Sequence, residues 1–355
     1  MKTSEKHAGA QRAAGSDVDG QRPSRRTGFG RRVLAARELG IIVALTLLVA
    51  VTTVVNPAFL SAQSVRDVLL GASILVILAV GQTVVIVSRN IDLSVGAVLG
   101  LVAFATGKLF GAAPGTPIIV AVLVGIALGA ACGVINGVLV AAARVPALVI
   151  TLGTLYMFRG IDHSWAKGEQ INAADMPAGF LRLGTSTLLG TPLLAVIALA
   201  VVLLVGAYLQ SYRSGRELYA IGSEPNAARL SGIPVGRRVF VAFVVSGAMA
   251  GLAGVLYAAR FGTIDATVGT GIELQVVAAA VVGGVAIFGG SGSVYGAAVG
   301  AVLLTTIGSS LAVLRINPFW QQAVVGGLIL AAIGLERLLA VRAANRLRGR
   351  TSHGA

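Results

Sequence analysis

A cation, an amide and a carboxylate stand close together in an otherwise apolar part of the chain. The stretch "VSRNIDLSVGAVLG", residues 87–100, contains Arg89, Asn90 and Asp92. Asp92 and Ser94 are residue types whose side chains accept hydrogen bonds from the free N–H groups at the start of a helix. Arg89 is near enough in sequence to neutralise Asp92, which would keep an isolated charge out of an apolar environment. We therefore expect a break between two helices, with a helix cap and an ion pair.

Other polar residues are scattered singly through apolar segments. Most isolated amides and hydroxyls of this kind join helices through hydrogen bonds that contribute about 0.6–2 kcal/mol each. Glu273 and Gln275 are stronger candidates for contact with a polar solute, because together they open a segment that is otherwise Val, Ala and Gly. The residues that we single out for such contact are Gln82, Asp92, Ser94, Asn136, Thr151, Glu273 and Gln275.

The composition indicates which elements carry these residues. Of the 355 residues, 56% are hydrophobic and 12% are charged, and the mean hydropathy is +0.87. The apolar residues form blocks of about 18 or more, the length that a helix needs to cross the hydrocarbon core of a membrane. We predict an all-α, polytopic integral membrane protein with about ten transmembrane helices. The predicted spans are 39–56, 67–88, 93–113, 117–141, 145–161, 186–209, 239–260, 271–289, 293–314 and 318–341.

Basic residues indicate the orientation of these spans. Nine of the 28 Lys and Arg residues precede the first span, five lie in the loop 210–238, and five cluster at the C-terminal end. The positive-inside rule places these clusters, and hence both termini, in the cytoplasm. We expect a disordered basic tail over 1–38, a transmembrane domain over 39–341 and a second basic tail over 342–355. The net charge of +14 then reflects topology and anionic lipid, and we expect no nucleic-acid partner.

Several kinds of active site are missing from the sequence. The glycine-rich stretch "FGGSGSVYG", residues 288–296, lacks the lysine of a nucleotide-binding phosphate loop. The single cysteine, Cys132, excludes an internal disulfide and a cysteine-based metal site, and the three histidines are scattered. We therefore expect no catalytic residue, no metal and no cofactor on this chain. The few carboxylates in the spans leave an ion-driven carrier open.

The loop 210–238 contains a second pattern of interest. It reads "QSYRSGRELYAIGSEPNAARLSGIPVGRR", and it predicts a short helix over 226–230 with Ser223 as its N-cap. Gly232 is expected to end this helix, with Pro234 as a stop. A short tethered helix with small apolar residues is suited to docking into a cleft of another protein. A helix on the lipid surface, or a plain connector, fits the same residues.

The chain resembles a known family at this loop. "GRELYAIGSEPNAARLSGIPVGR" is similar to the coupling loop of permease subunits of bacterial ABC importers for ribose, xylose, galactose and related monosaccharides. The stretches "GQTVVIVSRNIDLSVGAVLGL", "VPALVITLGTLYMFRG" and "VVAAAVVGGVAIFGGSGSVYGAAVGAVLL" agree with that family in the expected order. The family motif at the first of these has two glycines where this chain has Arg89 and Asn90. The later loop "GIDHSWAKGEQINAADMPAGFLRLG" resembles permeases for rhamnose or for the sugar-like autoinducer.

The resemblance implies a role in an assembly. Such a permease pairs with a copy of itself or a sister permease in the bacterial cytoplasmic (inner) membrane. A separate ABC ATPase subunit binds it from the cytoplasm, and an external sugar-binding protein delivers the solute. The coupling helix that enters the ATPase would contain Asn226, Ala227, Ala228, Arg229, Leu230 and Gly232. No covalent chemistry is then expected on this chain, since ATP is hydrolysed on the ATPase chain.

The function that we expect is import of a monosaccharide, with L-rhamnose or a related sugar favoured. The alternatives are an ABC permease for branched-chain amino acids and an ion-coupled secondary carrier. The break at Asp92 would line the passage or its gate, or it would be a short surface loop without a transport role; the first is favoured for Asp92 and the second for Arg89. The glycines of 283–300 predict close helix packing, and Gly289 and Gly290 additionally suggest a hinge.

Overall fold

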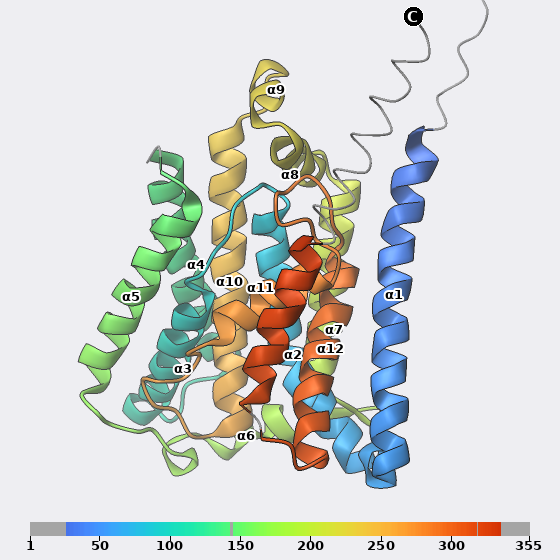
Figure 1. Cartoon of the computed structure of the whole chain (residues 1–355). Helices are drawn as coiled ribbons and strands as arrows, with labels where there is room; N and C mark the ends of the chain where they lie inside the picture. The colour runs from blue at the N-terminus through green and yellow to red at the C-terminus, as the bar shows by residue number, and fades with distance from the viewer. Residues whose placement is uncertain (1–25, 143–144, 318, 335–355) are drawn as a thin grey trace, which may run out of the picture.

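The computed structural model describes residues 26–142, 145–317 and 319–334 (Figure 1). The tail predicted for 342–355 lies outside these residues, as do the first 25 residues of the tail predicted for 1–38. The first helix, α1 (Arg26–Val55), begins within that predicted N-terminal tail. The last proline before it is Pro23, so no residue of 26–55 breaks the helical hydrogen-bond pattern.

Long helices form the body of the molecule, as Figure 1 shows. Six of the described helices are long and apolar enough to cross a membrane: α2 (Ala62–Ile86), α3 (Val95–Ala112), α4 (Ile118–Ala142), α7 (Leu193–Ser211), α10 (Val235–Phe261) and α12 (Val294–Val313). α5 (Ala147–Ala166) carries Arg159, Asp162 and His163 and is less apolar. Shorter apolar helices cover Leu39–Val55, Ile272–Val282 and Trp320–Gly334. The all-α, polytopic class is confirmed, and the count of ten spans stays a prediction.

Small elements lie at the two ends of the bundle. At one end are α8 (Arg213–Ser223) and α9 (Pro225–Leu230), and Figure 1 shows α1 starting at this end. α6 (Ala178–Thr185) lies at the opposite end. The chain there also forms η1 (Pro57–Leu60), η2 (Ala173–Asp175) and an antiparallel pair of strands, β1 (Thr187–Leu188) and β2 (Thr191–Pro192). The predicted span 186–209 therefore begins as a hairpin, and its helix starts only at Leu193.

Glycines bring α4 and α10 into direct backbone contact. A Cβ atom added to Gly129 would lie 2.3 Å from the carbonyl oxygen of Gly247, and one added to Gly247 would lie 2.3 Å from that of Gly129. Gly125 and Gly133 continue the same spacing of four residues along α4. Small residues at this spacing allow close packing of membrane helices. Cys132 is buried beside this stripe and packs there as another small residue.

α11 (Ile272–Val282) is a half-length helix. Its 11 residues rise about 16 Å, roughly half of the hydrocarbon thickness. The span predicted over 271–289 is wrong in this respect, because the helix ends at Gly283 and residues 283–293 return as an irregular loop. Gly283 packs closely on α12, where an added Cβ would lie 2.4 Å from the carbonyl oxygen of Gly296.

Candidate functional site

The break between α2 and α3 is organised around the carboxylate of Asp92. This residue is 1% exposed. Its Oδ1 accepts hydrogen bonds from the backbone N–H and the hydroxyl of Ser94, at 3.0 and 2.7 Å. Its Oδ2 accepts from the hydroxyl of Ser246 on α10, at 3.0 Å. Both carboxylate oxygens therefore have hydrogen-bond donors in the protein interior, as a buried acid requires.

Three further polar side chains join the break to α2, α4 and α5. The amide of Gln82, oriented to suit both partners, donates to the carbonyl of Asp92 at 3.0 Å and accepts from its N–H at 3.2 Å. Asn136 Nδ2 donates to Ser94 Oγ at 2.7 Å. Thr151 Oγ1 donates to the carbonyl oxygen of Ile91 at 3.1 Å. We call the set Gln82, Asp92, Ser94, Asn136, Thr151 and Ser246 the Asp92 cluster.

The Asp92 cluster unites five of the seven residues singled out from the sequence. All five are buried, and they bind one another or the backbone of the break. Ser246 was missed, because a single serine in an apolar helix gives no signal in the sequence. The arrangement satisfies backbone groups of the helix break from within the protein, which is the condition under which such a break is tolerated in a membrane domain.

Of the expectations for the break, the ion pair is wrong, and of the two candidate caps only Asp92 accepts a backbone N–H at the start of α3. Among the described residues no ion pair joins Arg89 to Asp92, because hydroxyl and amide donors already satisfy the carboxylate. The side chain of Ser94, the residue before α3, makes no capping hydrogen bond. Arg89 has a φ of 68°, the left-handed conformation that glycine adopts without strain. The backbone at Arg89 thus keeps the form suited to the glycine of the family motif.

Three segments distant in the sequence meet at the end of α2. The carbonyl oxygen of Val87 accepts from Gly290 N at 3.0 Å, and a Cβ added to Gly222 of α8 would lie 1.9 Å from the same oxygen. Tyr219 Oη donates to the carbonyl oxygen of Gly292 at 3.1 Å. We call the contact of Val87, Gly222 and Gly290 the glycine junction. It holds α8 directly against α2 and the loop that follows α11.

Gly289 and Gly290 have φ values of 81° and 77°. A Cβ on Gly289 would lie 2.8–2.9 Å from backbone atoms of Arg89, and one on Gly290 would lie 2.8–2.9 Å from those of Ser223. Close packing and backbone conformation thus both require glycine at these positions. The hinge stays a prediction. Gly215 lies within α8 and packs on the end of α7, where an added Cβ would be 2.4 Å from the carbonyl oxygen of Tyr208.

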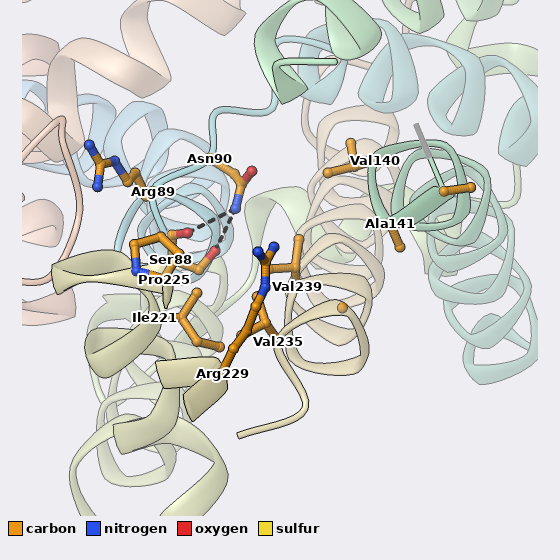
Figure 2. A pocket seen from close by; sticks show the side chains of 12 residues that line it. Ser88, Arg89, Asn90, Val140, Ala141, Ile221, Pro225, Arg229, Val235 and Val239 are labelled. Atoms are coloured by element: carbon orange, nitrogen blue, oxygen red, sulfur yellow. Dashed lines mark hydrogen bonds between the residues drawn. The ribbon is translucent and has the colours of Figure 1, made fainter. Parts of the chain in front are cut away.

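A cavity of about 650 Å³ lies between the break and α9. Figure 2 shows Ser88 and Asn90 on one side and Val235 and Val239 of α10 on the other, with the side chain of Arg229 extending between them. Asn90 Nδ2 donates to the carbonyl oxygen and hydroxyl of Ser88, at 2.9 and 3.1 Å. The side chain of Arg89 points away from Arg229 (Figure 2). The cavity separates the helix break from the short helix predicted to contact the ATPase.

α9 corresponds to the short helix predicted over 226–230. Pro225 occupies its first turn, and Gly232 follows it with a φ of 77°. The N-cap is Glu224, which accepts from Asn226 N at 3.3 Å, so the assignment of Ser223 is wrong. Ser223 is instead the last residue of α8, a helix that the sequence analysis missed because two glycines lie within it.

The side chains of α9 divide into two sets. Ala228 is 4% exposed and faces the rest of the chain, whereas Leu230 is 90% exposed. Asn226, Ala227 and Arg229 are exposed as well. Figure 1 shows α9 at the extreme end of the bundle. A protruding helix with a bare leucine is a candidate for a protein contact.

Glu217 ties α8 to the start of α10. Its Oε1 accepts from Arg213 Nε at 2.9 Å and its Oε2 from Arg238 Nε at 2.5 Å. The hydrogen bond from Arg238, followed by that from Arg213, holds the pKa of Glu217 below its ordinary value. The two arginines belong to the basic cluster that set the predicted orientation, so part of this cluster also fixes the loop.

We expect Glu217→Gln to loosen α8 from α10, because the uncharged amide pairs more weakly with two guanidinium groups. Limited proteolysis of the full chain should cleave the 210–238 region faster in this variant. Since the pKa is lower in the folded chain, the ion pairs stabilise it above the ordinary glutamate pKa of about 4.3 and are lost only as the pH falls through the lowered value. The rate at which the protease cleaves the 210–238 region of the wild-type chain should therefore stay constant between about pH 8 and pH 6.

The matched control is Glu169→Gln at the other end of the molecule. Glu169 pairs with Lys108 at 2.6 Å, and both side chains are partly exposed to solvent. Such a surface ion pair contributes little to the stability of the fold, so Glu169→Gln should leave the cleavage of the 210–238 region unchanged. Equal cleavage of the 210–238 region in wild type and Glu217→Gln would contradict the role assigned to Glu217.

The two remaining candidates lie away from the Asp92 cluster. Glu273 Oε1 accepts from Gly271 N at 3.2 Å, and its Oε2 is buried without a hydrogen bond in the described part of the chain. Gln275 lines a separate cavity. Arg159 was not singled out, although its Nη1 donates to the carbonyl oxygens of Val268 at 2.5 Å and Ala266 at 3.2 Å. It fixes the 262–271 loop over α3.

Known proteins resemble this chain over nearly the whole described region. Residues 64–333 match the family described as the branched-chain amino acid transport system permease component. The autoinducer 2 import system permease protein LsrC of Enterobacter sp. (strain 638) is 36% identical over 306 residues, which cover 86% of this chain and 88% of that protein. The LsrC protein of Escherichia coli (strain K12 / DH10B) is 37% identical over 299 residues, covering 84% and 86%. No solved structure matches the chain.

Proposed function

Because the chain belongs to the family of branched-chain amino acid transport system permease components, we propose that it forms part of the membrane pathway of an importer for autoinducer 2 or a related small sugar. The chain is an ABC-type permease, and it is a transport subunit rather than an enzyme. The substrate class is supported by relatives named for autoinducer 2 import that align with more than four fifths of this chain. L-Rhamnose remains the second candidate.

The proposed assembly places different partners at the two ends of the bundle. We assign α9 to contact with an ABC ATPase subunit in the cytoplasm, since it protrudes and exposes Leu230. An external binding protein would dock at the opposite end, where α6 and the β1–β2 hairpin lie. A second permease, identical or related, would complete the pathway in the inner membrane. The described residues would thus be one half of a channel.

The glycine junction is the observation that carries the proposed mechanism. ATP binding would draw the ATPase subunits together and move α9 and α8. Because Gly222 is packed on Val87 and Gly290, a displacement of α8 must also move the end of α2 and the loop after α11. These segments lead to the Asp92 cluster and to half-helix α11. The movement of a surface helix would in this way reach the interior of the membrane domain.

The contact with the ATPase is tested by Leu230→Asp. A charged side chain in place of an exposed leucine disrupts an apolar contact without disturbing the core, so we expect the variant to lose most of its copurification with the ATPase subunit. Arg229→Glu should act in the same direction. Ala228→Asp would bury a charge, and it reports on the folding of α9 rather than on docking.

The matched control for this contact is Leu189→Asp. Leu189 is 99% exposed in the turn between β1 and β2, at the other end of the molecule. It should leave copurification of the ATPase unchanged. If both aspartate variants retain the ATPase equally, α9 is not the docking helix.

The transport function itself is tested by uptake into vesicles that contain this permease with its ATPase and binding protein. The labelled solutes are autoinducer 2, L-rhamnose, D-ribose and L-leucine. ATP-dependent uptake of autoinducer 2 or a sugar supports the proposal, and uptake of L-leucine alone would make the chain an amino acid permease. Uptake without ATP, driven by an ion gradient, would replace the proposal by a secondary carrier.

A further inference from the structure

A cavity with both apolar and polar side chains in its lining lies within this single chain at the end of the bundle opposite α9. Its volume is about 380 Å³, within the range of about 300–1,000 Å³ typical of small-molecule sites. It is bounded by the start of α2, the end of α10, the start of α11, the second half of α12 and the helix Trp320–Gly334. The Asp92 cluster contributes none of its lining residues. We call it the outer cavity.

The polar groups of the outer cavity are available to a ligand. Tyr257, Arg260, Gln275 and Gln321 all line it, and within the described residues none of their side chains makes a hydrogen bond. Two amides and a phenol together supply both donors and acceptors. All four residues are partly exposed, so their polar groups can engage a ligand that enters the cavity.

Aromatic rings form one wall of the outer cavity. The rings of Tyr257 and Phe261 lie 4.4 Å apart between centroids at an angle of 38°. The guanidinium of Arg260 lies over the Phe261 ring, 4.6 Å from its centroid. The one carboxylate in the lining, Asp67, already accepts from Gln63 Nε2 at 3.0 Å. The charged groups of Asp67 and Arg260 thus already have partners in the protein, whereas the amides and the phenol have no hydrogen bond among the described residues.

We propose that the outer cavity binds a small polyhydroxylated solute of the size of a monosaccharide, inside one permease subunit and on the side from which the solute enters. Hydroxyl groups both donate and accept, so they match the amides of Gln275 and Gln321, and a ring face rich in C–H groups packs on the aromatic wall. The inference rests on the proposed function. It adds a binding site for the solute that lies wholly within one subunit and does not need a second permease to complete it.

The site is tested by equilibrium binding to the full-length permease, purified without the binding protein and reconstituted in lipid nanodiscs. The probes are labelled autoinducer 2, L-rhamnose and D-ribose, with L-leucine as the comparison solute. We expect saturable binding of at least one of the first three. Gln275→Leu and Gln321→Leu should each raise its Kd about tenfold, because each removes hydrogen bonds from a site that has little else to replace them.

Gln322→Leu is the matched control, since Gln322 is adjacent to Gln321 but exposed and outside the lining. It should leave the Kd unchanged. Tyr257→Phe removes only a hydroxyl, and it tests the site if the leucine variants are poorly folded. A wild-type permease that binds none of the three solutes, or binding that is equal in all variants, would overturn the inference. Preference for L-leucine would overturn the ligand class.

Vesicle uptake by the complete importer separates this inference from the proposed function. If wild-type vesicles import a sugar with ATP while the lining variants bind and import it normally, the function stands and the outer cavity is not its site. If no sugar is imported, the proposed function is contradicted, and the inference about the outer cavity, which depends on that function, is contradicted with it.

Discussion

Gly222→Ala is expected to reduce ATP-driven uptake at least tenfold. The added methyl carbon would lie 1.9 Å from the carbonyl oxygen of Val87 and 2.4 Å from the backbone nitrogen of Gly290. Both neighbours are backbone atoms, so no side chain can rotate to make room. Overpacking of this kind costs about 1–3 kcal/mol even where the surroundings can adjust, and about 1.4 kcal/mol corresponds to a factor of ten. α8 must therefore move away from α2.

The loss is expected in coupling as well as in stability. The hydrogen bond from Gly290 N to the Val87 carbonyl, 3.0 Å long, lies in the same contact and would be broken by the displacement. An importer with a separated junction should hydrolyse ATP without moving solute. The measurements are uptake and ATP hydrolysis on the same vesicles, together with the thermal unfolding temperature of the purified complex.

Gly111→Ala is the matched control for this substitution. Gly111 lies in helix α3, and a Cβ at that position meets no atom within 4 Å. Alanine has the higher helix propensity, so this variant should retain uptake and unfold at an equal or higher temperature. If Gly222→Ala imports solute at the wild-type rate, the three segments are not in tight contact, and another route must connect α9 to the interior.

The fold could be predicted from the sequence where a single property decides the structure. Long apolar blocks indicated the membrane class, and Pro225 and Gly232 indicated the helix α9, although its N-cap was misassigned. The helix α8 was missed because Gly215 and Gly222 read as breaks, whereas the structure uses them for close packing. The span predicted over 271–289 was too long, because hydropathy does not indicate that the glycine pair Gly283 and Gly284 ends α11. These failures concern contacts between distant segments.

The candidate site shows the same division. Asp92, Gln82, Asn136 and Thr151 stand out as polar residues in apolar segments, yet nothing in the sequence brings them together. Their meeting depends on how α2, α4 and α5 pack around the break. Ser246 could not be distinguished from any other helical serine. Arg89 was paired with Asp92 on sequence proximity alone, although the backbone directs its side chain elsewhere.

Asp92→Ala is expected to destabilise the folded chain by several kcal/mol, because each buried donor that loses its acceptor costs about 1–3 kcal/mol. The substitution leaves the backbone N–H and hydroxyl of Ser94 and the hydroxyl of Ser246 without their acceptor. Water cannot replace the carboxylate readily in a site so deeply buried. Thermal unfolding of the purified permease, followed by the loss of soluble protein, measures the effect.

Two milder variants are expected to lose less stability than Asp92→Ala. Ser246→Ala removes one hydrogen bond and should cost about 1 kcal/mol. Asp92→Asn keeps one acceptor oxygen and offers an amide that the Ser246 hydroxyl can accept from, so it should lie between wild type and Asp92→Ala. A stability series in this order, with the apparent affinity for solute unchanged in the folded variants, identifies the cluster as the support of the helix break.

The opposite result would restore the reading in which Asp92 touches the solute. In that case Asp92→Asn would unfold at the wild-type temperature yet lose uptake. A residue that contacts the solute would act through its charge, whereas a residue that holds the helix break acts through its hydrogen bonds. The geometry favours support, since both carboxylate oxygens already have donors, from Ser94 just before α3 and from Ser246 of α10. A helix break held this firmly can serve as the fixed point against which the glycine junction moves, and substitution at Asp92 should then affect both stability and coupling through a single cause.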